Sequence, residues 1–209
     1  MKEYNSIEFA EDAVINEDII IKGSAIARGN LKSALMIVSG ALEVGKDLKC
    51  SDNLTVKGKC HVKGLIKTKS LSTTGSIEAT SIEATIIQLA GKITIHSDVT
   101  ALESIIIEIK PKKRNVVIKG LVKAPKVRLI FRMFYTEWSS VPGKIVSRFG
   151  LRRHYKRKII IENLNIETDK LVIETPYPVD MIECFYTDCK INAGETELTR
   201  RVVPLPDSP

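Results

Sequence analysis

Apolar residues alternate with polar residues in short runs along most of the chain. Pairs of apolar residues two positions apart flank a series of glycines: Leu54 and Val56 precede Gly58, and Cys60 and Val62 follow it. Side chains two apart on a β-strand point to the same face, so each pair predicts a short strand with one buried face. An α-helix would need apolar residues three and four apart, and the β-branched residues that dominate the pairs favour strands.

The pairs recur with the glycines at a nearly constant period. The intervals along the series are 17, 18, 17 and 16 residues, and a sixth glycine follows after 29. A third pair lies seven to ten residues after each glycine. Three short strands per repeat predict one turn of a three-faced parallel β-helix, a solenoid whose inward side chains stack from turn to turn. Glycine is expected at a corner because the chain must bend there, often at positive φ. The glycines are Gly23, Gly40, Gly58, Gly75, Gly91 and Gly120.

The pattern continues beyond both ends of the glycine series. A first turn is expected near Ser6, and pairs between Ile159 and Ile173 resume the pattern after an interruption. The sequence therefore predicts an all-β chain of about nine turns, or about 43 Å of stack at ~4.8 Å per turn. We divide it into a β-helix over 1–131, an insertion over 132–158, a continuation over 159–192 and a C-terminal tail over 193–209. The expected core includes Ile19, Val38, Leu54, Val56, Ile77, Ile93, Ile95, Val116, Ile118 and Val122.

The net charge of +7 is confined to one segment. Residues 132–158 hold eight basic residues and one acid, Glu137, and therefore carry +7, whereas the other 24 basic and 24 acidic residues balance. A second insertion contains the short basic run from Lys110 to Arg114. Each insertion precedes an apolar pair of the same type, beginning at Val116 and at Ile159. We expect both to leave from the same corner on adjacent turns, which would gather their basic residues on one side of the rod.

The 132–158 insertion also concentrates aromatic residues, with five of the chain's eleven. Trp and Tyr favour the membrane interface, and clustered Lys and Arg favour anionic headgroups, so an anionic membrane surface is the expected partner. The same mixture could bind nucleic acid, a less favoured partner, through phosphate contacts and stacking. A third alternative is a hairpin or helix that packs its aromatics on the rod. The candidate contact residues are Lys112, Lys113, Arg114, Phe134, Tyr135, Trp138, Phe149, Arg152, Arg153, Lys156, Arg157 and Lys158.

Other functional classes find little support in the sequence. The N-terminus has no apolar stretch of the kind found in a secretory signal, and no run approaches the roughly 18 apolar residues of a membrane span. The four cysteines form no CxxC pair, which favours a reducing, cytoplasmic location. No nucleotide-binding or hydrolase motif occurs, and His61 and His154 lie far apart. We expect no enzymatic activity, cofactor or metal site, and we expect Cys50 and Cys60 to be small core residues.

The stretch from Gly40 to Ile95 resembles the bactofilin family of polymer-forming cytoskeletal proteins. The runs that carry the resemblance include GALEVGKDLKC, GKCHVKGLIK and GSIEATSIEA, in which a glycine precedes alternating apolar residues. The match extends from Gly23 to Leu129, roughly half of the chain. The resemblance implies a right-handed β-helix, end-to-end polymerisation into non-polar filaments without nucleotide, and a membrane-associated scaffolding role. The basic insertion is not a family hallmark, and the family's short apolar N-terminal membrane tail is not evident in MKEYNSIEF.

The expected polymer interface is the N-terminal end of the rod. A β-helix ends in open strand edges, which are templates for another copy unless they are capped. The apolar candidates at this end are Ile7, Phe9 and Val14. Like-on-like contact there, with a second contact at the other end, would propagate a filament. The alternatives are a capped monomeric β-helix adaptor for an anionic partner, a hexapeptide-repeat acyltransferase, and a β-helical polysaccharide lyase or hydrolase. The drift of the period disfavours the acyltransferase, and the missing secretion signal and acid cluster disfavour the last class.

Overall fold

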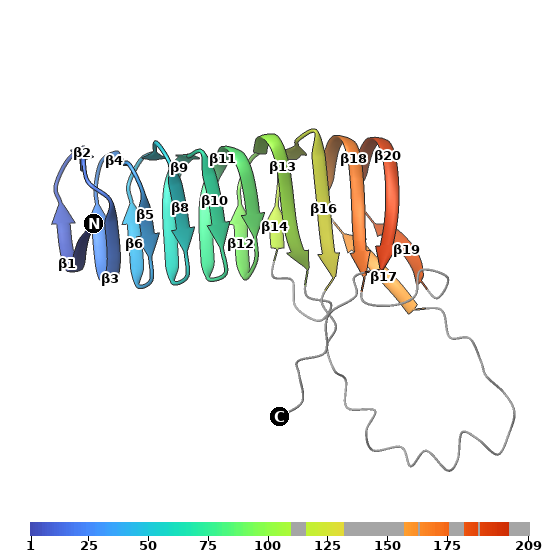
Figure 1. Cartoon of the computed structure of the whole chain (residues 1–209), viewed down its shortest axis with the longest axis horizontal. Helices are drawn as coiled ribbons and strands as arrows, with labels where there is room; N and C mark the ends of the chain where they lie inside the picture. The colour runs from blue at the N-terminus through green and yellow to red at the C-terminus, as the bar shows by residue number, and fades with distance from the viewer. Residues whose placement is uncertain (110–115, 132–156, 163, 176–181, 188, 201–209) are drawn as a thin grey trace, which may run out of the picture.

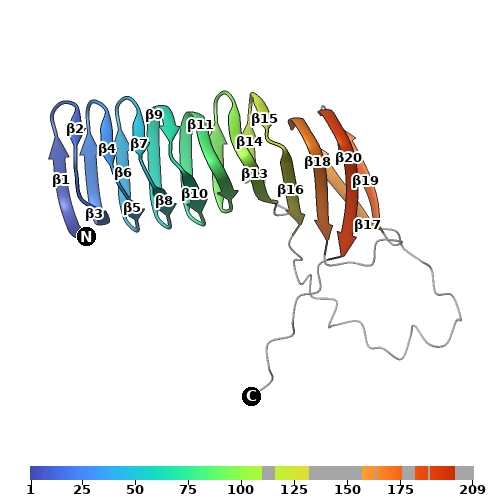
Figure 2. The same cartoon turned by 45° about the horizontal axis from the view of Figure 1, so that its top comes forward.

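The chain coils into a straight rod of stacked parallel strands. The computed structural model describes residues 1–109, 116–131, 157–162, 164–175, 182–187 and 189–200. These residues form strands and turns, with no helix among them. Every strand pair between described residues is parallel. The strands lie side by side from β1 at one end to β19 and β20 at the other (Figures 1 and 2). The architecture is thus the predicted all-β solenoid, with about seven turns.

The strands follow one another without intervening elements. They are β1 (Lys2–Phe9), β2 (Ala13–Val14), β3 (Ile19–Ala27), β4 (Leu31–Ser33), β5 (Met36–Val38), β6 (Ala41–Val44), β7 (Leu48–Cys50), β8 (Asn53–Val56), β9 (Lys59–Lys67) and β10 (Ser70–Thr73). The second half comprises β11 (Ser76–Leu89), β12 (Lys92–Ile95), β13 (Val99–Ile109), β14 (Val116–Ile118), β15 (Leu121–Lys123), β16 (Lys126–Phe131), β17 (Arg157–Glu162), β18 (Asn165–Thr175), β19 (Ile182–Thr187) and β20 (Lys190–Arg200).

Each turn contributes one strand segment to each of three faces. Face 1 is built on β5, β8 and β10, which pair in that order. Face 2 is built on β6 and the first half of β9, and face 3 on β4, β7 and the second half of β9. The long strands β3 and β13 bend around one corner and serve two faces each, and β11 bends around two corners and serves all three. Because the register keeps equivalent residues opposite one another, each inward side chain packs on its counterpart in the next turn.

A continuous apolar stack fills the rod. Nine of the ten predicted core residues are buried, and Val56, Ile95 and Val122 are completely inaccessible. The exception is Val116, which is half-buried but still packs against the core. Cys50 and Cys60 are buried as predicted. Because each turn covers its apolar face only with its neighbours, the stability of the rod is collective.

The order of the faces after Gly91 differs from the sequence prediction. The spacing places Val116 and Ile118 on face 1, but in the structure they continue face 2 beside β12. Ile105 and Ile107 occupy face 1 instead, and both are fully buried. The 29-residue interval before Gly120 therefore contains a further face 1 strand, and no glycine follows that strand. The sequence prediction treats Gly120 like the earlier glycines of the series. It therefore assigns each apolar pair around Gly120 to a face one step away from the observed one.

The glycines are required mainly for close approach between turns. Among the described glycines only Gly91 has a positive φ, of 97°, so the predicted reason is wrong for most of the series. A Cβ on Gly58 would lie 1.9 Å from the carbonyl oxygen of Gly40, which occupies the same corner one turn earlier. No side chain can occupy such a position without moving the backbone apart.

A second corner is built on side-chain hydrogen bonds. Asp12 accepts a hydrogen bond from the backbone N–H of Asn30 at 2.8 Å, and Asn30 in turn accepts one from the N–H of Asp47 at 3.1 Å. Asp47 accepts a bond from the N–H of Leu65 at 3.0 Å. Short side chains of Asp and Asn commonly satisfy turn N–H groups in this way. The ladder fixes the corner between faces 2 and 3 from turn to turn.

The far end of the rod extends past the predicted boundary of the solenoid. β20 pairs in register with β18 and continues to Arg200, so residues 193–200, predicted as a tail, are a strand. β17 and β19 form a separate parallel pair. Strands therefore resume after both insertions, with β14 after residues 110–115 and β17 after residues 132–156.

Candidate functional site

The N-terminal end of the rod is an open strand edge. β1 pairs with β3 and β2 pairs with β4, and no other described strand pairs with either. Both lie at the outer end of the stack in Figure 1. The backbone edge of β1 is therefore available over the eight residues of the strand. An edge of this length is a template for another strand.

The last turn at this end leaves its inward side chains only partly covered. Five side chains pack against the core below them but have no turn above them, and each is half-buried: Tyr4, Ile7, Phe9, Ala13 and Ile15. Ile7 and Phe9 are thus where the sequence places them. The sequence interpretation missed the other three. Tyr4 lies three positions before Ile7, outside the alternation of Ile7 and Phe9, because the register of β1 shifts between Tyr4 and Ser6.

Val14 lies on the side of the rod and does not belong to the end surface. Its register partner is Lys32, an outward residue of face 3, and 65% of the Val14 side chain is exposed. Val14 therefore lies beside the end surface that Ile7 and Phe9 help to form, and its part in an interface stays a prediction. Alternation explains this position, because Ala13 and Ile15 point inward and the residue between them must point outward.

Charges along the open edge are paired within the rod. Glu3 forms an ion pair with Lys22 at 2.7 Å, and Glu8 accepts hydrogen bonds from both Nε and Nη2 of Arg28, at 2.9 and 2.7 Å. Lys2 lies over the ring of Tyr4, 5.5 Å from its centroid. Unpaired charges on an edge strand commonly oppose strand addition. Because Lys22 and Arg28 of the next turn neutralise Glu3 and Glu8, these carboxylates oppose the addition of another strand less strongly.

The C-terminal end has a different character. Ile191, Ala193 and Leu198 of β20 pack against the core and remain half-buried. On its outer side Lys170 contacts Glu195 at 3.4 Å and Glu197 at 2.8 Å. The hydrogen bond from Lys170 lowers the pKa of the Glu197 carboxyl below its ordinary value. The two ends therefore present different surfaces to a partner.

The predicted membrane contacts lie almost entirely outside the described residues. This holds for Lys112, Lys113, Arg114, Phe134, Tyr135, Trp138, Phe149, Arg152, Arg153 and Lys156. Arg157 and Lys158 begin β17. The strands that precede the two insertions are neighbours, since Ile109 at the end of β13 is the register partner of Phe131 at the end of β16. Both insertions therefore start from the corner between faces 1 and 2.

The histidines that the sequence left unassigned meet on face 2. His61 Nδ1 lies 3.4 Å from one carboxylate oxygen of Glu78, and His96 Nε2 lies 3.2 Å from the other. His61 is the register partner of Glu78, 17 positions away, and the repeat period could have indicated this pair. On the other side the register partner of Glu78 is Thr94, and His96 lies two residues beyond it. The contact with His96, followed by that with His61, lowers the pKa of the Glu78 carboxyl.

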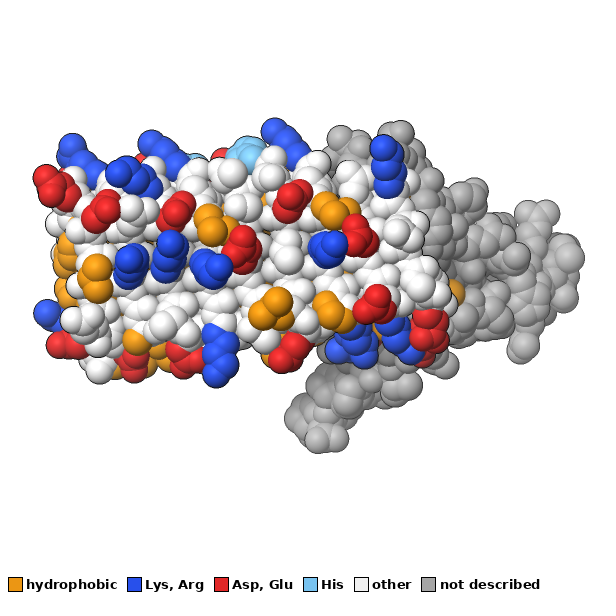
Figure 3. Space-filling view, turned by 90° about the horizontal axis from the view of Figure 1, so that it is seen from above, with side chains coloured by type: hydrophobic (Ala, Val, Ile, Leu, Met, Phe, Trp, Pro, Cys, Tyr) orange, Lys and Arg blue, Asp and Glu red, His pale blue; other side chains and the backbone are white. Residues whose placement is uncertain are grey.

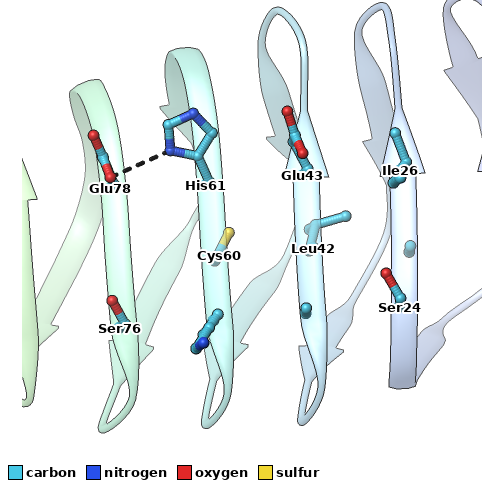
Figure 4. A pocket seen from close by; sticks show the side chains of 11 residues that line it. Ser24, Ile26, Leu42, Glu43, Cys60, His61, Ser76 and Glu78 are labelled. Carbon is cyan, nitrogen blue, oxygen red and sulfur yellow. Dashed lines mark ion pairs between the residues drawn. The ribbon is translucent and has the colours of Figure 1, made fainter.

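A shallow groove beside these residues contains no activated nucleophile among the side chains that the structure describes. Ser24, Ser76 and Glu43 line it with Glu78 and His61, as Figure 4 shows. Cys60 also lines the groove but is buried, and burial raises the pKa of its thiol to about 12. Burial likewise raises the pKa of Cys50 to about 11. A thiol with such a pKa stays protonated near neutral pH and is inert.

Among the described residues, no group of three or more His, Cys, Asp or Glu side chains is placed to hold a metal ion. The same part of the chain contains no helix with the length and apolar character needed to cross a membrane. Comparison with models of known protein families, with curated proteins and with solved structures finds no match for this chain.

Proposed function

We propose that the protein is a non-enzymatic structural element that assembles end to end into filaments without nucleotide. The observation that carries this proposal is the open N-terminal end, where the edge of β1 and a half-covered apolar turn coincide. Joining two such ends would bury Tyr4, Ile7 and Phe9 and satisfy the free N–H and C=O groups of β1. The half-buried residues of β20 would supply the second contact that a filament needs.

The resemblance to bactofilins supports the same function. It implies a right-handed coil, and with strands β17 and β19 counted as parts of further turns we propose a solenoid of nine turns. The proposal also places the filament in the cytoplasm as a scaffold, with other copies of the chain as its principal partner.

The proposed filament attaches to the inner face of the membrane through its basic insertions. Their shared starting corner supports this part of the proposal, because twelve basic residues would then face one side. Near an anionic surface each Lys or Arg contributes about 1 kcal/mol. A filament repeats the patch along its length, so weak single contacts add up to firm attachment.

Substitution of Phe9 by Arg tests the assembly. The half-buried ring of Phe9 packs against the core at the open end, and a guanidinium there would have to lose its water when two ends join. We expect Phe9→Arg to abolish the filaments that electron microscopy of the parent detects, and to leave a monomer in sedimentation velocity.

Leu102→Arg is the matched control, because 75% of the Leu102 side chain is exposed on the side of the rod. It should form filaments as the parent does. Circular dichroism and thermal melting must be alike in both variants. A parent chain that stays monomeric at high concentration would contradict the filament and favour a capped adaptor for an anionic partner.

A further inference from the structure

Three lysines stand in a row along face 3. Lys32, Lys49 and Lys67 are register partners on consecutive turns and point outward from β4, β7 and β9. Consecutive turns are spaced by about 4.8 Å, so the stems run parallel and the charges are close. Figure 3 shows Lys and Arg side chains, in blue, lined up along the middle of the surface that it views. The three lysines line a shallow groove on this face, distinct from the groove on face 2, and Lys69 lines it from the adjoining corner.

Two of the three lysines in this row have no ion-pair partner among the described residues, whereas charges further along the face are paired. Further along the same outward positions the signs alternate, with Lys67 bonded to Glu83 at 2.9 Å and Lys123 to Glu167 at 2.5 Å. Lys32 and Lys49 form no ion pair with any described residue. Like charges directly opposite one another destabilise a sheet. The attraction between Lys32 and Asp12 and the ion pair of Lys67 with Glu83 oppose this repulsion at the two ends of the row, and Lys49 between them has no ion pair with a described residue.

The row is narrow, and the corners on both sides of it carry charges of both signs. One border is the corner between faces 2 and 3, with Asp12, Lys46, Asp47 and Lys63, and the other is the corner between faces 3 and 1, with Glu17, Asp52 and Lys69. Lys46 contacts Asp12 at 4.0 Å and Lys69 contacts Asp52 at 3.9 Å, so positive and negative charges are paired at both corners. A broad anionic surface would meet these carboxylates together with the lysines. A ligand one chain wide would meet the lysines alone.

The chemistry of the face selects among narrow ligands. Proteins that bind single-stranded nucleic acid stack its bases on aromatic side chains. The outward positions of face 3 in the described strands include no aromatic residue. An extended peptide places alternate side chains on one side, about 6.6 Å apart, and flexible lysine stems can follow that spacing. Val14 at the N-terminal end of the row is 65% exposed and would contact an apolar residue of the same peptide.

We infer that face 3 binds an extended acidic segment of a partner protein, which lies along the rod over Lys32, Lys49 and Lys67. The segment carries Asp or Glu at alternate positions and an apolar residue at the end next to Val14. Glu83 closes the other end of the row by its ion pair with Lys67. This surface lies on the side of the rod, so the inference does not depend on end-to-end assembly.

Fluorescence anisotropy with the full chain tests the inference. The probe is a labelled peptide with glutamate at four alternate positions separated by threonines and ending in leucine, and its control replaces the glutamates by glutamine. We expect only the acidic peptide to bind, with an affinity that falls as salt rises. The double variant Lys32→Ala/Lys49→Ala should weaken binding about fivefold, which corresponds to two exposed ion pairs.

Lys59→Ala/Lys92→Ala is the matched control, since both lysines are exposed on face 2 and the variant loses the same charge. It should keep the parent affinity within about twofold. Equal losses in both variants, or no binding of the acidic peptide, would overturn the inference. Binding of oligo(dT) or of phosphatidylglycerol vesicles that depends on Lys32 and Lys49, when peptide binding does not, would overturn it in favour of those ligands.

Discussion

At the scale of single residues, alternation decides which substitutions the rod tolerates. Val56 and Lys57 are neighbours in sequence, yet Val56 is fully inaccessible and Lys57 is exposed. The stacked register means that Val56 touches its counterparts in the turns on both sides, Val38 and Thr73. A carboxylate at such a position has no water, and the one buried hydroxyl beside it that makes no hydrogen bond, that of Thr73, cannot replace its hydration.

The substitution Val56→Asp should therefore lower the free energy of unfolding by about 3–5 kcal/mol, because a carboxylate would be buried in a dry stack. Lys57→Asp places the same side chain in solvent and should change stability by less than about 1 kcal/mol. Urea unfolding followed by circular dichroism measures both. Equal stability of the two variants would mean that the strand faces are assigned to the wrong sides.

At the scale of the strand, the period of two could be predicted because burial on one face imposes it directly on the sequence. The apolar pairs up to Ile95 therefore locate strands and faces together. The face assignments after Gly91 could not be predicted, since they depend on which corner needs a glycine. That need comes from the approach of two backbones, as at Gly58 and Gly40, and the corner after Ile109 lacks this marker.

Contacts across turns were also beyond the sequence interpretation. The lysine row and the contacts of Glu78 with His61 and His96 arise from register between consecutive strands. The apolar pairs of the sequence already place Lys32, Lys49 and Lys67 outward. Intervals of 16 to 18 residues leave open which outward residues are direct neighbours, and the register of the strands settles this.

The repulsion within the lysine row gives a prediction at this scale. Lys49→Glu would place a carboxylate between Lys32 and Lys67, its register partners, and would replace two repulsions by two attractions. We expect the free energy of unfolding to rise by about 0.5 kcal/mol, measured by urea denaturation at low salt. The gain should shrink at high salt because exposed charges are screened.

Lys59→Glu serves as its control. The register partners of Lys59 are Ala41 and Ser76, so reversing its charge removes no repulsion across the strands. It should not raise stability. A similar rise in both variants would point to a general effect of lower net charge, and no rise for Lys49→Glu would mean that the stacked lysines do not repel one another measurably.

At the scale of the whole molecule, the rod separates three surfaces. Its ends carry the half-covered turns, the corner between faces 1 and 2 is where both insertions begin, and face 3 carries the lysine row. In a three-faced coil, face 3 lies opposite that corner. A filament attached to a membrane through the insertions would therefore turn its lysine rows toward the opposite side, where a soluble partner can reach them.

Excising residues 132–156 tests the membrane surface without touching the other two. The strands they connect, β16 and β17, can be joined by a six-residue Gly-Ser linker, because six residues, 110–115, connect β13 and β14 from the same corner. We expect the variant to melt like the parent and to form filaments, but to lose co-flotation with vesicles that contain anionic lipid.

Trp138 is the only tryptophan, so in the parent a blue shift of its emission on adding these vesicles should accompany binding. Parent chain variants with Arg152, Arg153 and Lys156 changed to alanine should show a weaker shift. Undiminished flotation of the excised chain would assign membrane contact to another part of the molecule, and the absence of flotation for the assembled parent would remove the membrane from the proposed function.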